Sequence, residues 1–221
     1  MTKVPYAPYD YWRYTAFKKI QNHGYLWPAV LNELHRHTAL SLRVLDAGCG
    51  SGAFSKMLHE TLGFEVYGCD LSESGIALAR QNAPDCRFEL LSMYDDFVAS
   101  FGTRFDVVVS VEVVEHLYDP ETFVVRVREA LTPEGIFVLT TPYHGYFKNL
   151  VIAAAGRCDG HYNPLQKGGH IKFWSKPTIT KLLESAGFSV ERISGVGRFP
   201  WLWKSMVIVA RRNGTRSTAK S

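Results

Sequence analysis

The stretch VLDAGCGSGAFS (residues 44–55) combines the end of an apolar run, a glycine turn and the start of a helix. The run at 42–48 is short, mostly apolar and closed by glycine, which is typical of a buried strand. Gly48, Gly50 and Gly52 follow at alternate positions. Glycine permits a tight turn and lets a ligand approach the backbone closely. The pattern therefore predicts a strand–turn–helix unit that binds a ligand at its turn.

Two acidic residues narrow the kind of ligand. Asp46 stands just before the glycines, where it would disfavour a pyrophosphate. Asp70 ends the next predicted strand (64–70), where an acid can accept hydrogen bonds from both hydroxyls of a ribose. No Gly-Lys-Ser/Thr follows the glycines, which excludes a P-loop.

Strands and helices alternate along the chain. This alternation predicts an α/β fold: a Rossmann-like, doubly wound, mostly parallel seven-stranded sheet with helices on both faces. The last two strands form an antiparallel pair, so the last strand is antiparallel. Further strands are expected at 86–92, 105–113, 135–142, 189–196 and 203–212, and further helices at 52–61, 72–83, 120–131 and 176–188.

The chain of 221 residues is expected to form a single domain over 1–212. Within it we expect an N-terminal helical arm or lid (1–40) and an insertion after the fifth strand (143–170), followed by a disordered tail (213–221). The net charge of +4 demands no nucleic-acid face. The absence of an apolar leader and of long apolar runs, and four scattered cysteines expected to be reduced thiols, predict a cytoplasmic protein.

Together, the glycine turn and its two acids resemble the class I S-adenosylmethionine-dependent methyltransferases. The resemblance implies that Gly48 and Gly50 approach the methionine moiety, that Asp46 orders the loop and that Asp70 binds the ribose. At the third strand, where this family often has an acid facing the adenine, the chain has Ser92 and Met93. The implied cofactor-binding residues are Asp46, Gly48, Cys49, Gly50, Asp70, Leu71, Ser92, Met93 and Val111.

A cluster of ionisable residues follows the fourth strand in VSVEVVEHLYDP (109–120). Glu112, Glu115 and His116 stand at i, i+3 and i+4, which places them on one side of a helical turn. Acids are also common at helix starts, where they complement the helix dipole. The residues alone leave both interpretations open.

This cluster, the insertion and the motif GGHIKF (168–173) resemble the O-methyltransferases of ubiquinone biosynthesis. By that resemblance, Glu112, Glu115, His116 and His170 are the candidate ligands of a divalent metal such as Mg²⁺, and the first three are the candidate catalytic residues. A nearby cation would favour the phenolate of an acceptor whose pKa is ordinarily ~10. Without a metal, His116 could act as general base.

The predicted activity is O-methylation of a hydroxyl on a small phenolic or quinol-like, lipid-linked acceptor. Small-RNA 2′-O-methyltransferases carry a similar cluster, so an RNA or a sugar hydroxyl is an alternative. Scattered Lys and Arg residues argue against nucleic acid. A non-catalytic S-adenosylmethionine-binding protein is a third alternative, and the oligomeric state is left open.

The insertion contains FKNLVIAAAGR (147–157), an apolar segment between basic ends that is too short to span a bilayer. One interpretation is a helix that lies on a membrane through residues 146–157, which suits a lipid-linked acceptor at the inner face of the membrane. The other is a helix that covers the active site and packs on the core.

Overall fold

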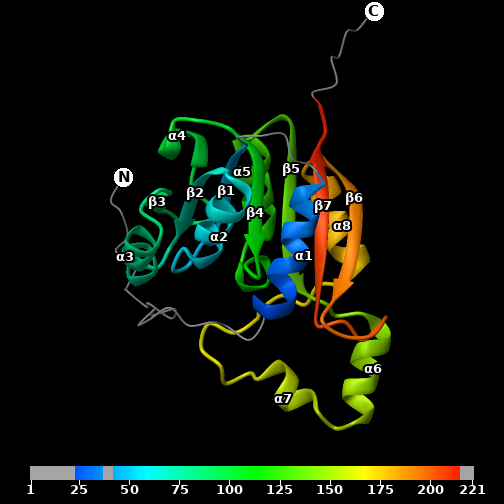
Figure 1. Ribbon diagram of the computed structural model, residues 1–221. Helices are drawn as coiled ribbons and strands as arrows, with labels where there is room; N and C mark the ends of the chain where they lie inside the picture. The colour runs from blue at the N-terminus through cyan, green and yellow to red at the C-terminus, as the bar shows by residue number, and fades with distance from the viewer. Residues whose placement is uncertain (1–22, 37–41, 215–221) are drawn as a thin grey trace, which may run out of the picture.

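The computed structural model describes residues 23–36 and 42–214, and its centre is a seven-stranded sheet with the order β3-β2-β1-β4-β5-β7-β6 (Figure 1). Strands β1 to β5 are parallel to one another, whereas β7 is antiparallel to both β5 and β6. The predicted fold class, with its antiparallel last strand, is confirmed. The strands are β1 Arg43–Ala47, β2 Glu65–Asp70, β3 Arg87–Leu90, β4 Phe105–Val111, β5 Leu131–Pro142, β6 Phe188–Val196 and β7 Ser205–Arg212.

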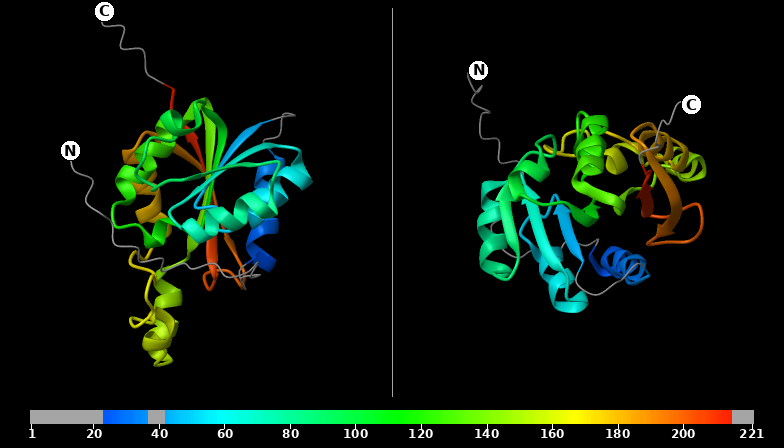
Figure 2. Two further views of the ribbon diagram at one scale, coloured as in Figure 1. Left: turned by 90° about the vertical axis from the view of Figure 1, so that its left-hand side faces the viewer. Right: turned by 90° about the horizontal axis from the view of Figure 1, so that it is seen from above.

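Helices cover both faces of the sheet, as Figure 2 shows from above. Central strands are buried on both sides: β1 is buried from Val44 to Ala47, and β7 from Ser205 to Ala210. This explains why they read as continuous apolar runs instead of alternating ones. One layer contains α1 His23–His35, α2 Ala53–Leu62 and α3 Glu73–Asn82, and the other contains α4 Phe97–Phe101, α5 Pro120–Ala130 and α8 Lys176–Ser185.

Helix α1 belongs to the core rather than to a lid. It buries Leu26, Val30 and Leu34 against the face of the sheet that also carries α2. A helix that contributes three such side chains cannot open without exposing core surface. For the described part of the predicted N-terminal segment, this burial favours the packing arm over the lid. Residues 1–22 and 37–41 lie outside the described residues, as do 215–221 of the predicted tail.

Helix α4 was not expected from the sequence. It has only five residues, which is too short for a helical period to be seen. Asp96 caps it by accepting a hydrogen bond from the backbone N–H of Ala99 at 3.0 Å, and Gly102 ends it in the left-handed region. Its Phe97 and Phe101 join the core cluster beneath α5.

The insertion forms two short helices, α6 Tyr146–Ala154 and α7 Cys158–Tyr162, beyond the carboxyl end of β5 (Figure 1). Of the α6 side chains, only that of Lys148 is buried. Its apolar side chains Phe147 and Leu150 are about half exposed, at 51% and 50%. Of the two interpretations of this helix, this exposure disfavours the one in which it packs its apolar side on the core. In the part of the chain that the structure describes, no helix is both long and apolar enough to cross a membrane.

Candidate active site

The glycine turn joins β1 to α2 at the carboxyl edge of the sheet. Gly48, Gly50 and Gly52 all have positive φ angles, of 90°, 53° and 74°. The backbone N–H groups of Gly48 and Cys49 donate to the carbonyl of Cys69 at 2.8 and 3.0 Å, so the turn is attached to the end of β2. These bonds fix the turn so that it faces the space beyond the carboxyl ends of β1 and β2.

Two of these glycines are required for space as well as for backbone conformation. A Cβ on Gly48 would lie 2.4 Å from a methyl carbon of Val113, and one on Gly52 would lie 2.9 Å from the backbone of Ala79. Both contacts are shorter than atoms tolerate. Gly48 thus allows the turn to pass closely beside the segment after β4, which carries the ionisable cluster.

The two acids of the turn have different environments. Asp46 is buried and accepts a hydrogen bond from the Ser55 hydroxyl at 2.6 Å, which links β1 to the first turn of α2. Asp70 accepts from the backbone N–H groups of Gly50 at 2.9 Å and Ser72 at 2.8 Å. The carboxylate of Asp70 therefore stands at the mouth of the turn, where a ribose would meet it.

The remaining predicted cofactor residues lie around the same edge. Leu71 directly follows Asp70 and is 63% exposed, which suits a side chain that a ligand would cover. Met93 is buried in the loop after β3, where the N–H of Ser92 donates to Asp95 at 2.8 Å. Asp95 is an acid at the third strand that the sequence analysis missed.

The last two predicted cofactor-binding residues are Cys49 and Val111. Cys49 is buried with the cluster beneath α3, so only its backbone faces the turn. Val111 is the half-buried last residue of β4. All four cysteines of the chain are free thiols, as predicted.

Asp46 makes the stability of the fold depend on pH. Burial, reinforced by Asp70 and opposed by the hydrogen bond from Ser55, raises the pKa of Asp46 from 3.8 to about 7. Because this folded pKa lies above the unfolded one, the contribution of Asp46 to stability is fully present below about pH 4 and is lost as the pH rises through 7. We expect Asp46→Asn to raise the free energy of unfolding at about pH 8 by on the order of 2 kcal/mol, since an amide keeps part of the burial cost. Urea unfolding measures this gain, which should shrink toward pH 5; a gain independent of pH would contradict it.

Glu112 leaves the strand in an unexpected direction. Its φ angle is +56°, in the left-handed region, and it precedes a 3₁₀ turn, η1 Val114–His116, instead of an α-helix. Its carboxylate accepts hydrogen bonds from Thr140 of β5 at 3.0 Å and from Ser205 of β7 at 3.3 Å. The prediction that Glu112 shares one side of a helical turn with Glu115 and His116 is therefore wrong, because no helical turn includes it.

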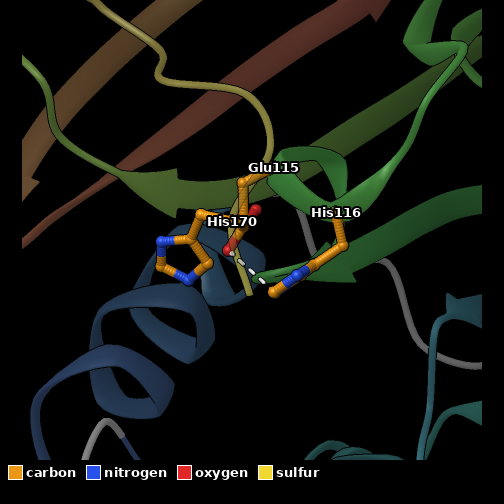
Figure 3. Close-up of side chains that lie close together, drawn as sticks. All are labelled: Glu115, His116 and His170. Carbon is orange, nitrogen blue, oxygen red and sulfur yellow. Dashed lines mark ion pairs between the residues drawn. The ribbon is translucent and has the colours of Figure 1, made fainter. Parts of the chain in front are cut away.

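Glu115, His116 and His170 come together beside this turn (Figure 3). One ligand atom from each of the three side chains lies within 4.8 Å of the others, and Glu112 is outside this group. His116 Nε2 is 3.9 Å from Glu115 Oε1. The imidazoles of His116 and His170 lie on either side of the Glu115 carboxylate, with ring centroids 4.9 Å apart (Figure 3). The structure thus brings together three of the four predicted metal ligands.

Backbone hydrogen bonds fasten the end of the insertion to η1. The N–H groups of Ile171 and Lys172 donate to the carbonyl of Glu115 at 2.9 and 3.0 Å. His116 Nδ1 lies 3.2 Å from the carbonyl of Gly169, 53 residues along the chain. With a proton on Nδ1 this is a hydrogen bond, and it leaves the lone pair of Nε2 toward Glu115. These bonds explain how His170 reaches the cluster.

Burial sets the protonation of the group. It raises the pKa of Glu115 well above the ordinary value, reinforced by the neighbouring Glu112. Burial also raises the pKa of Glu112 to about 7. It lowers the pKa of His116, and partial burial with the neighbouring His116 and His161 lowers that of His170 to about 4. Both imidazoles are therefore neutral at pH 7, which is the form that binds metals.

This donor set fits a divalent transition metal. Glu115 Oε2 accepts from Thr141 at 3.1 Å, whereas the buried Oε1 has no hydrogen-bond partner among the described residues. A buried oxygen without a partner is costly, and a cation would satisfy it. Ligand atoms ~2.1 Å from a metal lie roughly 3 to 3.5 Å apart, so a small rotation of the exposed His170 would close the group. One carboxylate and two imidazoles suit Mn²⁺, Fe²⁺ or Zn²⁺ better than Mg²⁺.

Two neighbours of the cluster were missed by the sequence analysis. Thr141 orients Glu115, and its only sequence signal is its place at the end of β5. His144 is buried beside Phe173, and neither of its ring nitrogens makes a well-formed hydrogen bond to the described residues. Burial and the nearby Lys148 lower its pKa to about 4. The sequence could not distinguish this buried histidine from a solvated one.

Comparison with known proteins identifies the family. A family model described as "Methyltransferase domain" matches residues 12–193. The chain belongs to the class I S-adenosylmethionine-dependent methyltransferases. This methyltransferase is 33% identical over 168 residues to the ubiquinone biosynthesis O-methyltransferase of Cereibacter sphaeroides, covering 73% of this chain and 67% of the relative. It is 32% identical over 167 residues to that of Ruegeria sp., covering 74% and 66%. The alignments thus span about two thirds of these relatives.

Solved structures share the fold of this methyltransferase. The TehB-like SAM-dependent methyltransferase of Corynebacterium glutamicum has a TM-score of 0.61 and 21% identity, covering 85% of this chain and 87% of its own. Magnesium protoporphyrin IX methyltransferase of Synechocystis PCC 6803, with bound SAH, has a TM-score of 0.64 and 20% identity, covering 84% and 81%. At these identities the likeness establishes the fold alone.

Proposed function

We propose that this methyltransferase transfers a methyl group to a hydroxyl of a small phenolic or quinol-like, lipid-linked acceptor, with the help of a divalent metal. The observation that carries the proposal is the Glu115–His116–His170 group beside the glycine turn. Val113 is the link between the two, because it packs against Gly48 and precedes η1. The names of the relatives, which are ubiquinone biosynthesis O-methyltransferases, support oxygen as the methylated atom.

Residues of the turn would hold S-adenosylmethionine, which supplies an activated methyl group. Asp70 can accept hydrogen bonds from ribose hydroxyls, because each carboxylate oxygen keeps a further lone pair after it accepts from the N–H of Gly50 or Ser72. The backbone at Gly48 and Gly50 leaves room for the methionine moiety. Leu71 and Met93 are the apolar side chains placed to enclose the adenine.

Glu115, His116 and His170 would hold the metal and position the acceptor. A divalent cation bound by them would lower the pKa of an acceptor hydroxyl. Thr141 fixes the Glu115 carboxylate, and the carbonyl of Gly169 fixes the ring of His116. Without a cation, the neutral His116 is itself placed to accept the hydroxyl proton.

A methyl-transfer screen with labelled S-adenosylmethionine tests the function. Catechols, quinols, sugars and short RNAs are offered to the full chain, with and without a chelator, followed by addition of Mn²⁺, Fe²⁺, Zn²⁺ or Mg²⁺. We expect transfer to catechols or quinols that falls at least about tenfold with chelator and returns with a transition metal. Transfer to RNA or sugar alone would overturn the proposed acceptor. If chelator does not change the transfer rate, no metal takes part and His116 accepts the proton of the acceptor hydroxyl.

We also propose that α6 rests on the inner face of a membrane. Tyr146, Phe147, Leu150 and Val151 are all exposed large hydrophobic side chains of this helix, with exposed fractions of 84%, 51%, 50% and 40%. The helix lies outside the sheet and its helical layers (Figure 1). An apolar helix surface with basic residues near it is typical of interfacial binding, and it would meet a lipid-linked acceptor there.

Phe147→Ser/Leu150→Ser is expected to reduce co-sedimentation with anionic liposomes at least about fivefold, because about half of each side chain is available to insert. A matched control is Leu90→Ser/Val125→Ser, which removes two exposed apolar side chains from the body of the protein. Equal loss in both variants, or none in either, would contradict membrane contact through α6.

A further inference from the structure

A cavity of about 560 Å³ lies between the insertion and the loop that joins β6 to β7. Three of its lining side chains are permanent or potential cations, Lys148, Arg157 and Arg198, and His161 adds an imidazole. Val151 and Leu202 give it an apolar part. None of the residues that line it is acidic.

None of these cations is neutralised by an ion pair, and Glu112 acts on Lys148 only from beyond ion-pair distance. Among the ion pairs of residues 23–36 and 42–214, none includes Lys148, Arg157 or Arg198. Lys148 is only 6% exposed, and its Nζ donates to the backbone carbonyls of Tyr143 at 2.6 Å and Lys204 at 3.4 Å. Most buried lysines are paired with a carboxylate. Burial and Arg198 lower the pKa of Lys148 to about 8, so an anion in the cavity would restore its full charge.

The cavity adjoins the candidate active site. Lys204, whose carbonyl accepts from Lys148, directly precedes Ser205, which donates to Glu112. On the other side, His161 lines the cavity, and its ring centroid lies 5.5 Å from that of His144, a neighbour of the cluster. An acceptor that reaches the Glu115–His116–His170 group can therefore extend into this space.

We propose that the cavity is the subsite that recognises an acidic group, a phosphate or a carboxylate, on an amphiphilic acceptor. Arg157 and Arg198 offer planar guanidinium groups that suit both anions, and Lys148 supplies a third charge from the floor. The apolar part, at Val151 and Leu202, takes the hydrocarbon next to the acid. This subsite rests on the proposed function, which supplies the hydroxyl that is methylated. It restricts the acceptor to molecules that also carry an acidic group.

Binding of three matched probes tests the subsite without any methyl transfer. Geranyl phosphate, geranic acid and geraniol share one hydrocarbon and differ in the polar end. Titration calorimetry of the full chain saturated with S-adenosylhomocysteine should show geranyl phosphate or geranic acid binding at least about tenfold more tightly than geraniol. Arg157→Gln/Arg198→Gln should lose that preference. The control Arg87→Gln/Arg126→Gln removes two arginines far from the cavity and should keep it.

Other outcomes overturn the subsite. It is wrong if all three probes bind equally, or if the cavity and control variants lose affinity together. Vesicles of phosphatidylcholine with and without phosphatidylglycerol test whether the arginines bind a lipid headgroup instead of an acceptor. If the two arginines are needed for binding to the anionic vesicles and the soluble acids do not bind, the proposed subsite is wrong. If no hydroxyl acceptor is methylated in the methyl-transfer screen, the proposed function is wrong, but the binding results with the three probes still apply.

Discussion

Glu115→Gln and His116→Ala, made separately, are each expected to lower kcat by about 100-fold to 1000-fold. Their affinity for S-adenosylmethionine should stay within about twofold of wild type, because neither side chain belongs to the glycine turn. Glu115→Gln removes the buried oxygen Oε1 as an anionic ligand but leaves an atom to accept from Thr141. His116→Ala removes the imidazole that faces it. Single-turnover kinetics with the acceptor found in the screen, and calorimetry with the cofactor, measure the two effects.

A second readout separates a metal site from a general base. If the three residues hold a cation, both variants should also lose Mn²⁺ or Zn²⁺ binding, measured by equilibrium dialysis. If His116 acts as the base, His116→Ala alone should abolish the rise of kcat with pH on the acidic side of the profile, where the imidazole loses its proton. The matched controls are Glu121→Gln and His59→Ala, which alter an acid and a histidine outside the cluster. Wild-type turnover in both cluster variants would reject their catalytic role.

Local patterns predicted most of the fold for a physical reason. Strands buried on both faces must be continuously apolar, as at Val107–Val109 in β4, and helices between them must repeat an apolar face, as in α5. The glycine turn was also predictable, because its backbone conformation and its contact with Val113 admit no other residue at Gly48. Such features depend on residues that are adjacent in the sequence.

The direction of Glu112 could not be predicted in the same way. Spacing places it with Glu115 and His116 only if the chain is helical from Glu112 onward. The backbone instead turns left-handed at Glu112, where its N–H donates to Thr140 and its carboxylate accepts from Thr140 and Ser205. These partners belong to strands 28 and 93 residues away. A tertiary contact therefore overrides the local pattern.

The exposure of α6 illustrates a second limit. Its apolar composition is equally compatible with a buried helix and with one that meets a membrane, because periodicity does not say what lies opposite. His170 was assigned only by resemblance, since nothing local connects it to His116. Its position depends on the backbone hydrogen bonds that Ile171 and Lys172 make to Glu115.

Asp70→Ala is expected to weaken S-adenosylmethionine binding by at least about 100-fold, because two charge-assisted hydrogen bonds to a ribose would be lost. The same change frees the N–H groups of Gly50 and Ser72, which would loosen the turn and add to the loss. At saturating cofactor, kcat should fall far less than the affinity, since Asp70 stands apart from the Glu115–His116–His170 group.

The matched control for Asp70→Ala is Glu73→Ala, which removes an exposed acid from the first turn of α3, three residues further along. It should leave the Kd for the cofactor within about twofold. Asp70→Asn separates the two roles of the acid, because an amide oxygen can still accept from one N–H of the turn while the charge is gone. If Asp70→Asn binds the cofactor as weakly as Asp70→Ala, the affinity depends mainly on the negative charge of the carboxylate that accepts from the ribose hydroxyls. If Asp70→Ala keeps the wild-type Kd, the acid only shapes the turn, and ribose recognition would have to be assigned to another group at the carboxyl end of β2.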